Sequence, residues 1–221
     1  MQNLEKINKI YSILEKESSK FTIPLAEQIQ IKTKNPFFVL IGTILSARTK
    51  DTTTAKICDK LFLKIKNFED LEKISLKELE ELIYGVGFYK TKAKHLKELP
   101  FTIKKFNNKI PKTIEELISL PGVGRKTANL VVSVAFDKPA ICVDTHVHKI
   151  FNRIGIINTK TPLETEIQLR KILPINLWQK TNLYFVILGQ NICLSINPKC
   201  NICPINTLCE KKINKKNINN I

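Results

Sequence analysis

Four cysteines near the C-terminus have a spacing that suits metal binding. Cys193, Cys200, Cys203 and Cys209 follow the pattern C-x6-C-x2-C-x5-C within 17 residues. Four thiolates this close together in sequence can surround one metal centre, and their spacing alone allows either a four-cysteine zinc site or a [4Fe-4S] cluster. A disulfide framework is the weaker interpretation because the N-terminus is polar and does not resemble a secretory signal.

A second candidate site is the segment from Leu120 to Asn129, which reads LPGVGRKTAN. A Pro-Gly turn ends one helical stretch, and another helix is expected to begin close to Arg125. The backbone amides of Gly122, Val123 and Gly124 and of the first helical turn would point outward together and could bind one phosphate. Such backbone donors would position a nucleic acid without reading its sequence. A nucleotide-binding P-loop is excluded because the segment does not match that motif.

The Gly-Val-Gly tripeptide also occurs earlier, at Gly85-Val-Gly87, and is followed by Phe88. Glycine suits a turn that needs positive φ or a close approach of two backbones. For Gly85, a purely structural turn between two helices is as plausible as a binding role.

The charge favours a polyanionic partner. Lys and Arg number 36 against 20 Asp and Glu, which gives a net charge of +16. Nucleic acid is the first interpretation and an acidic membrane surface the second. The charge is locally concentrated, since residues 85–112 contain eight Lys and one Glu. No apolar run approaches the roughly 18 residues that span a bilayer. We therefore expect an intracellular protein that is not secreted and does not associate with a membrane.

Helical periodicity runs through most of the chain and predicts an all-α fold. Ser75 and Thr113 each precede a glutamate by three residues, which is the capping-box pattern of a helix N-terminus. Thr161 is followed by proline, which is favoured at the first position of a helix. Asp51 is predicted to cap the helix that runs to Lys66. At the mean helix length, the chain should hold roughly ten helices.

These motifs together resemble the helix-hairpin-helix DNA glycosylases, and within that superfamily the iron–sulfur endonuclease III family. The resemblance extends from about Pro36 to Cys209. It includes the hairpin at 120–129, the segments ILSA at 44–47, GVGFY at 85–89 and VDTH at 143–146, and the four C-terminal cysteines.

The resemblance assigns catalytic roles to two residues. Lys126 matches the catalytic lysine of the family, and Asp144 matches its catalytic acidic position. Lysine attacks carbon only as the neutral amine, and a partly buried cleft, Arg125 and a helix N-terminus would disfavour its ammonium form. The alternatives are that Lys126 only contacts phosphate and that Asp144 only caps the helix that begins at Thr145.

The resemblance also implies residues that contact DNA. The family inserts side chains from two loops into the gap left by the extruded nucleotide. Arg48 stands where the family usually has glutamine, and Phe88 follows the first Gly-Val-Gly. The alternatives are that Arg48 is a phosphate contact and that Phe88 is a core residue. In the family, the loop between the first two cysteines is usually more basic and touches DNA. In this chain, Lys199 is the only basic residue of that loop.

The cysteine pattern matches the cluster loop of the family, so the resemblance favours a [4Fe-4S] cluster over zinc. It implies a six-helix-barrel-like lobe with the hairpin, at 28–138. A discontinuous cluster lobe, at 1–27 and 139–221, would complete the fold. The active site would lie in the cleft between the two lobes.

The implied function is that of a bifunctional DNA glycosylase and AP lyase of base excision repair. It would act as a monomer on double-stranded DNA and remove damaged, most plausibly oxidised, pyrimidines through a lysine Schiff base and β-elimination. One alternative is a monofunctional mismatch glycosylase of the same superfamily. Others are a non-catalytic helix-hairpin-helix DNA-binding protein with a structural metal, and an iron–sulfur electron carrier, which would leave the hairpin unexplained.

Overall fold

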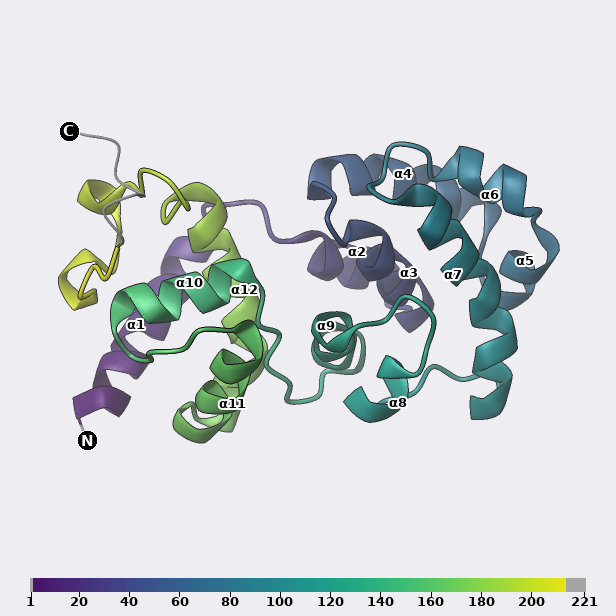
Figure 1. The fold of residues 1–221 in the computed structure, drawn as a ribbon. Coiled ribbons are helices and arrows are strands. Elements are labelled where there is room, and N and C mark those ends of the chain that lie inside the picture. The colour runs from purple at the N-terminus through teal and green to yellow at the C-terminus, as the bar shows by residue number, and fades with distance from the viewer. Residues whose placement is uncertain (1, 214–221) are drawn as a thin grey trace. The chain divides into compact units, whose positions relative to one another are not determined.

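The computed structural model describes residues 2–213, and this part of the chain is entirely helical (Figure 1). It contains twelve α-helices and four short 3₁₀-helices and, within these residues, no strand. The predicted all-α class is therefore confirmed. None of the helices described is long and apolar enough to cross a membrane.

The chain divides into two compact units. Unit 1 combines Met1–Pro24 with Pro139–Ile221, and unit 2 is Leu25–Lys138. The lobes expected from sequence were 1–27 with 139–221, and 28–138. The last eight residues of the first of these, 214–221, lie outside the described part.

Unit 2 is built around a buried central helix. Helix α3 (Pro36–Ser46) has eight buried residues and packs against α2, α4, α7 and α9. Asn35 caps it by accepting a hydrogen bond from the Phe37 amide, and proline occupies its first position. The other helices are α2 (Leu25–Thr33), α4 (Asp51–Lys64), α5 (Phe68–Lys73), α6 (Leu76–Leu82), α7 (Tyr89–Ile103), α8 (Ile114–Ile118), α9 (Arg125–Phe136) and the 3₁₀-helix η1 (Lys104–Phe106).

Unit 1 packs α1 and α10 against α12 around an aromatic core. The rings of Phe151 and Phe185 lie 4.3 Å apart between centroids, and Tyr11 meets Phe185 edge-on at 5.6 Å. Its helices are α1 (Gln2–Ser18), α10 (Thr145–Ile154), α11 (Pro162–Ile172), α12 (Trp178–Asn191), η2 (Ile175–Leu177), η3 (Cys200–Ile202) and η4 (Asn206–Leu208).

Three predicted helix caps are confirmed. The hydroxyls of Ser75, Thr113 and Thr161 each accept a hydrogen bond from the amide three residues later. The prediction for Asp51 is wrong. Lys50 is the N-cap residue of α4, and the Asp51 carboxylate instead accepts a hydrogen bond of 3.3 Å from the amide of Leu25. Asp51 thus joins the start of α4 to the start of α2.

Candidate functional site: a hairpin, a helix-capping aspartate and a cysteine pocket

The hairpin between α8 and α9 contains two glycines, of which the fold requires only one. Gly122 has φ +75°, and a Cβ there would lie 2.9 Å from Nδ1 of His95. Both the backbone and the packing of unit 2 therefore require glycine at this position. Gly124 has an ordinary φ of −89°, and apart from its neighbours in the chain no atom of the described residues lies within 4 Å of where its Cβ would be.

Gly124 is also the N-cap residue of α9, and no side chain caps this helix. Because the fold does not need glycine there, the open space beside the helix start suits the close approach of an anion. The side chain of Val123 is only 5% exposed and belongs to the core. Any contact of Val123 with a partner would therefore come from its backbone.

Lys126 lies in the first turn of α9 and its side chain is exposed, as is that of Arg125. Thr127 and Ala128 follow it and are buried. The expected partial burial of Lys126 is not seen. Lys126 therefore lies at the surface beside the start of α9, two residues after Gly124.

Asp144 is the N-cap of α10. Its Oδ1 accepts hydrogen bonds from the amides of His146, at 2.8 Å, and Val147, at 2.9 Å. Asp144 therefore caps α10, as the capping interpretation predicted, and its catalytic role stays a prediction. Lys126 belongs to unit 2 and Asp144 to unit 1. Their pairing in one active site stays a prediction.

Arg48 and Phe88, forty residues apart in sequence, meet on unit 2. The guanidinium carbon of Arg48 lies 5.5 Å from the centroid of the Phe88 ring. Arg48 is exposed, and Phe88 is 62% exposed, which excludes a core role for Phe88 within the described structure. Both residues have left-handed backbones, with φ of +55° and +59°. Such strain in residues other than glycine is common at functional sites.

The glycines near Phe88 are structural. Gly85 has φ +102°, which favours glycine in the turn after α6. A Cβ at Gly87 would lie 2.8 Å from the carbonyl oxygen of Arg48, so the two loops touch backbone to backbone. Their contribution to a DNA-binding surface would be to hold Arg48 and Phe88 together.

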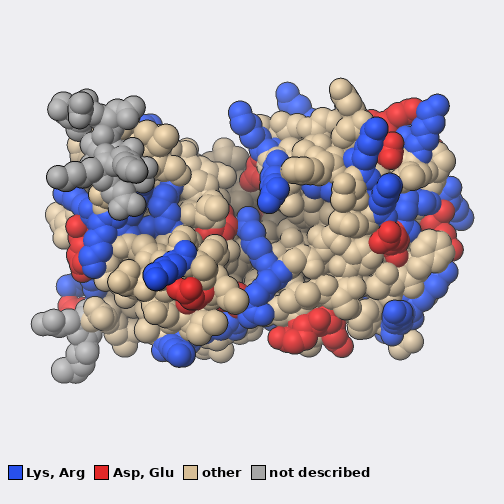
Figure 2. Space-filling model, viewed as in Figure 1, with Lys and Arg blue, Asp and Glu red and all other residues tan. Residues whose placement is uncertain are grey.

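Two lysines of the basic segment 85–112 direct their ammonium groups to backbone carbonyls of unit 2. Lys92 is 6% exposed, and burial lowers its pKa to about 8. Its Nζ donates to the carbonyls of Leu45 and Ala47. Lys97 donates in the same way to three carbonyls of the α5–α6 region. Lys and Arg side chains are nevertheless numerous on the face of unit 2 shown in Figure 2.

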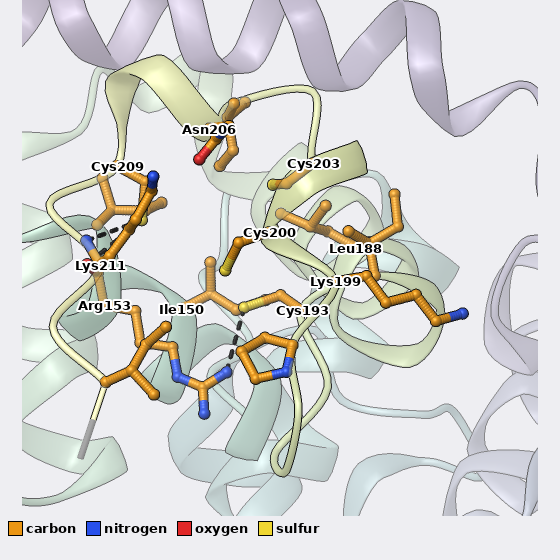
Figure 3. A pocket seen from close by; sticks show the side chains of 15 residues that line it. Ile150, Arg153, Leu188, Cys193, Lys199, Cys200, Cys203, Asn206, Cys209 and Lys211 are labelled. Carbon is orange, nitrogen blue, oxygen red and sulfur yellow. Dashed lines mark hydrogen bonds between the residues drawn. The ribbon is translucent and has the colours of Figure 1, made fainter. Parts of the chain in front are cut away.

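The four C-terminal cysteines line one pocket, with side chains that approach it from different sides (Figure 3). Helices α10 and α12 contribute the apolar wall, which includes Ile150, Ile154 and Leu188. No Asp or Glu lines the pocket, whereas Arg153, Lys199 and Lys211 do. Four thiol donors in an apolar and basic setting fit a group whose overall charge, thiolates included, is negative.

A four-cysteine zinc site and a [4Fe-4S] cluster both need four thiolates, and the pocket brings four cysteines together. Among the described residues, no group of three or more His, Cys, Asp or Glu side chains is arranged to hold a metal ion. Burial raises the pKa of the Cys203 thiol to about 11, so ligation must displace its proton.

Sequence reasoning did not assign a role to Arg153, which is 5% exposed. Its guanidinium donates to Sγ of Cys193 at 3.4 Å, to the carbonyl of Leu194 at 2.6 Å and to that of Ser195 at 2.8 Å. Its own carbonyl accepts from the amide of Lys212. Arg153 therefore ties α10 to both ends of the cysteine segment. The sequence signal for a buried role of Arg153 was its place next to Ile154, on the apolar face of α10.

Lys199 lies in the loop between the first two cysteines, with an exposed side chain. Its amide donates to the carbonyl of Ile192 at the end of α12. The backbone at Lys199 is thus fixed while its side chain remains accessible.

The fold, the glycine hairpin and the four-cysteine pocket define a class, the helix-hairpin-helix DNA glycosylases. Residues 41–175 match the family model described as HhH-GPD superfamily base excision DNA repair protein. Endonuclease III of Thermotoga maritima is 45% identical over 180 residues, which cover 81% of this chain and 84% of that protein. The chain belongs to the endonuclease III branch of the HhH-GPD superfamily, and it is a base-excision-repair DNA glycosylase and AP lyase.

Solved structures agree with this placement. A trapped covalent intermediate of endonuclease III with DNA, in an estranged-adenine complex, matches with a TM-score of 0.76 and 40% identity over 80% of this chain and 84% of that one. A thermostable thymine-DNA glycosylase matches with a TM-score of 0.82 and 27% identity, covering 94% of this chain and 96% of that chain. The similarity thus includes both an endonuclease III and a thymine-DNA glycosylase.

Proposed function

We propose that the protein removes oxidised pyrimidines from double-stranded DNA and then cleaves the strand, with Lys126 as the nucleophile. The observation that carries the proposal is the position of Lys126 in the first turn of α9, beside the open Gly124. A phosphate held at this helix start would bring the sugar next to it close to the lysine amine.

The chemistry follows from an amine nucleophile. The neutral Nζ of Lys126 attacks C1′ of the damaged nucleoside, and the glycosidic bond breaks so that the base leaves with the bonding electron pair. Loss of the amine proton and opening of the sugar ring give an imine between lysine and C1′. Removal of a proton from C2′ then expels the 3′ phosphate, which nicks the strand.

Asp144 is proposed to stabilise positive charge that develops on the sugar as the base leaves. Two amide hydrogen bonds fix the position of one of its oxygens. A fixed carboxylate needs no reorganisation during the reaction, which is what makes such a group effective.

Arg48 and Phe88 are proposed to fill the gap in the stack when the nucleotide is extruded. Their side chains are exposed, adjacent and held by strained backbones. A planar guanidinium could stack in the gap or donate to the unpaired base, and the ring of Phe88 could stack on its neighbours. Glycines 122 and 124, Val123 through its backbone, Arg125 and Lys199 would contact the DNA backbone.

The endonuclease III family carries a [4Fe-4S] cluster. We propose that Cys193, Cys200, Cys203 and Cys209 hold it in this chain. When bound, the cluster would order the loop that bears Lys199. Arg153 would support Cys193, and the amide of Lys211, which lies 3.3 Å from Sγ of Cys209, would donate a hydrogen bond to that sulfur.

Protein purified without oxygen should contain about four irons per chain and absorb as a [4Fe-4S] centre does. Cys203→Ser should lose the iron, while the buried Cys58, which lies in unit 2, can be changed to Ala as a matched control that keeps it. Stoichiometric zinc in protein prepared with ample iron would overturn the cluster assignment.

The substrate is tested with a panel of duplexes, each with one defined lesion. The proposal predicts base release and strand cleavage at an oxidised pyrimidine such as thymine glycol, in a monomeric enzyme. The likeness to a thymine-DNA glycosylase makes the monofunctional mismatch enzyme the second candidate. Release of thymine from a G·T pair with no cleavage would favour that candidate.

A further inference from the structure

The loops that carry Arg48 and Phe88 are joined by hydrogen bonds. We call residues 47–50 and 85–88 the wedge loops. The amide of Gly87 donates to Oγ1 of Thr49 at 2.9 Å, and a Cβ at Gly87 would collide with the carbonyl of Arg48. The two loops therefore form one surface, although helices α4, α5 and α6 separate them in sequence.

Lys92 lies buried beneath this surface and bonds to both loops. Its Nζ donates to the carbonyl of Ala47 at 2.6 Å and to Oγ1 of Thr49 at 3.3 Å, on either side of Arg48. It also donates to the carbonyl of Leu45, at 2.7 Å, at the end of α3. Its own amide donates to the carbonyl of Phe88 at 3.0 Å in the first turn of α7.

This arrangement explains how two strained residues hold their conformation. An L-residue stays in the left-handed region only when its surroundings impose it. The carbonyl of Ala47 and the hydroxyl of Thr49, before and after Arg48, are both held by the buried ammonium group of Lys92. The backbone amide of Lys92 holds the carbonyl of Phe88 in the first turn of α7. A wedge ordered before DNA arrives loses less entropy when it inserts.

We propose that Lys92 is a positioning residue for base extrusion, which it assists by holding Arg48 and Phe88 in the geometry that fills the vacated stack. It does not touch DNA, because it is 6% exposed and faces inward. This inference rests on the proposed role of Arg48 and Phe88.

The chain supplies a matched control for Lys92. Lys97, on the same helix, donates to the carbonyls of Leu71 and Glu72, both at 2.9 Å, and of Ile74 at 2.6 Å. Lys97→Met and Lys92→Met remove the same charge and the same kind of bonds to backbone carbonyls. Only Lys92 holds the wedge loops.

The experiment measures base release in a single turnover and the fluorescence of 2-aminopurine placed opposite a thymine glycol. Lys92→Met should slow both the fluorescence change and base release by roughly tenfold to a hundredfold, as expected for a displaced functional group. Thr49→Val removes the hydrogen bonds that Oγ1 accepts from Gly87 and from Lys92 but keeps the bonds of Lys92 to the carbonyls of Leu45 and Ala47, so it should show a smaller loss of the same kind. Lys97→Met should behave as wild type.

A second duplex separates extrusion from chemistry. A thymine glycol opposite an abasic-site analogue has no paired base to separate from during extrusion. On this duplex, the rate of base release by Lys92→Met should be within about threefold of the wild-type rate. An equal loss on both duplexes, or an equal effect of Lys97→Met, would overturn the positioning role. If Arg48→Ala and Phe88→Ala leave extrusion unchanged as well, the proposed role of these two residues is wrong. If both of them slow extrusion and Lys92→Met does not, only the positioning role of Lys92 is rejected.

Discussion

At the scale of single residues, Asp144 shows how one side chain can serve both fold and chemistry. One oxygen caps α10 through two amide bonds of 2.8 and 2.9 Å. A cap of this kind contributes about 1 kcal/mol to stability. The same bonds fix one oxygen of the carboxylate, so the structural role would support the electrostatic role that we propose for Asp144 in catalysis.

Asp144→Asn should separate these roles. Asparagine caps helices about as well as aspartate, so the free energy of unfolding should change by less than about 1 kcal/mol. Loss of the charge should slow base release by roughly a hundredfold or more, as measured in single turnovers. Reaction at a pre-formed abasic site should suffer less because the base has already left. Full glycosylase activity in Asp144→Asn would exclude the electrostatic role.

At the scale of elements, the hairpin before α9 contains one glycine required by the fold and one that is not. Gly124→Val introduces a side chain where, apart from the neighbours in the chain, no atom of the described residues lies within 4 Å, so thermal unfolding should change little. Binding to duplex DNA should weaken for all sequences alike, because backbone amides supply the contact. Binding is measured by fluorescence anisotropy at several salt concentrations.

Gly122→Ala is the counterpart, since it strains a φ of +75° and meets His95. It should lower the unfolding temperature. Normal DNA binding by Gly124→Val would show that α9 does not hold a phosphate at this position.

Helix α2 carries an ionisable group that should make stability depend on pH. Burial, with a smaller contribution from Asp51, raises the pKa of Glu27 from 4.5 to about 7, and its Oε2 has no partner within the described structure. The folded state therefore binds the proton more tightly than the unfolded state. Glu27 is protonated in both states below about pH 4.5, and the cost of its burial appears as the pH rises to about 7.

Glu27→Gln should accordingly stabilise the protein at pH 8, by up to about 3 kcal/mol, and have little effect near pH 4.5. Urea unfolding at the two pH values measures this difference. Glu98→Gln, an exposed change on α7, should show no such dependence. An equal effect of Glu27→Gln at both pH values would contradict the assigned cause.

At the scale of the whole molecule, the sequence predicts the all-α class and the motifs because these depend on local patterns. Capping boxes at Ser75 and Thr113 are local, and so are the glycine hairpin and the cysteine spacing. The sequence patterns do not show which distant segments are in contact, because such contacts depend on the fold. The bonds from Lys92 to the loop before α4, and from Arg153 to the cysteine segment, join residues about 40 apart.

The amino-acid composition also did not predict which individual lysines are exposed. Lys92 adds to the net charge of +16 and to the basic segment 85–112, yet it is buried. Its place on the apolar stripe of α7, four residues before Leu96 and seven before Leu99, was the signal that could have shown this. The exposed charge that remains suits a DNA partner, and no single lysine outside the active site should dominate binding.

The most direct test of the account is borohydride trapping on DNA with one oxidised pyrimidine. Borohydride should reduce the imine between Lys126 and C1′ and leave a stable covalent complex in the wild type. Lys126→Gln should abolish trapping and strand cleavage but keep most of the DNA affinity, because one charge among +16 is a small part of the attraction. Undiminished trapping by Lys126→Gln would show that another amine is the nucleophile, and base release by the wild type without any trapping would contradict the Schiff-base mechanism.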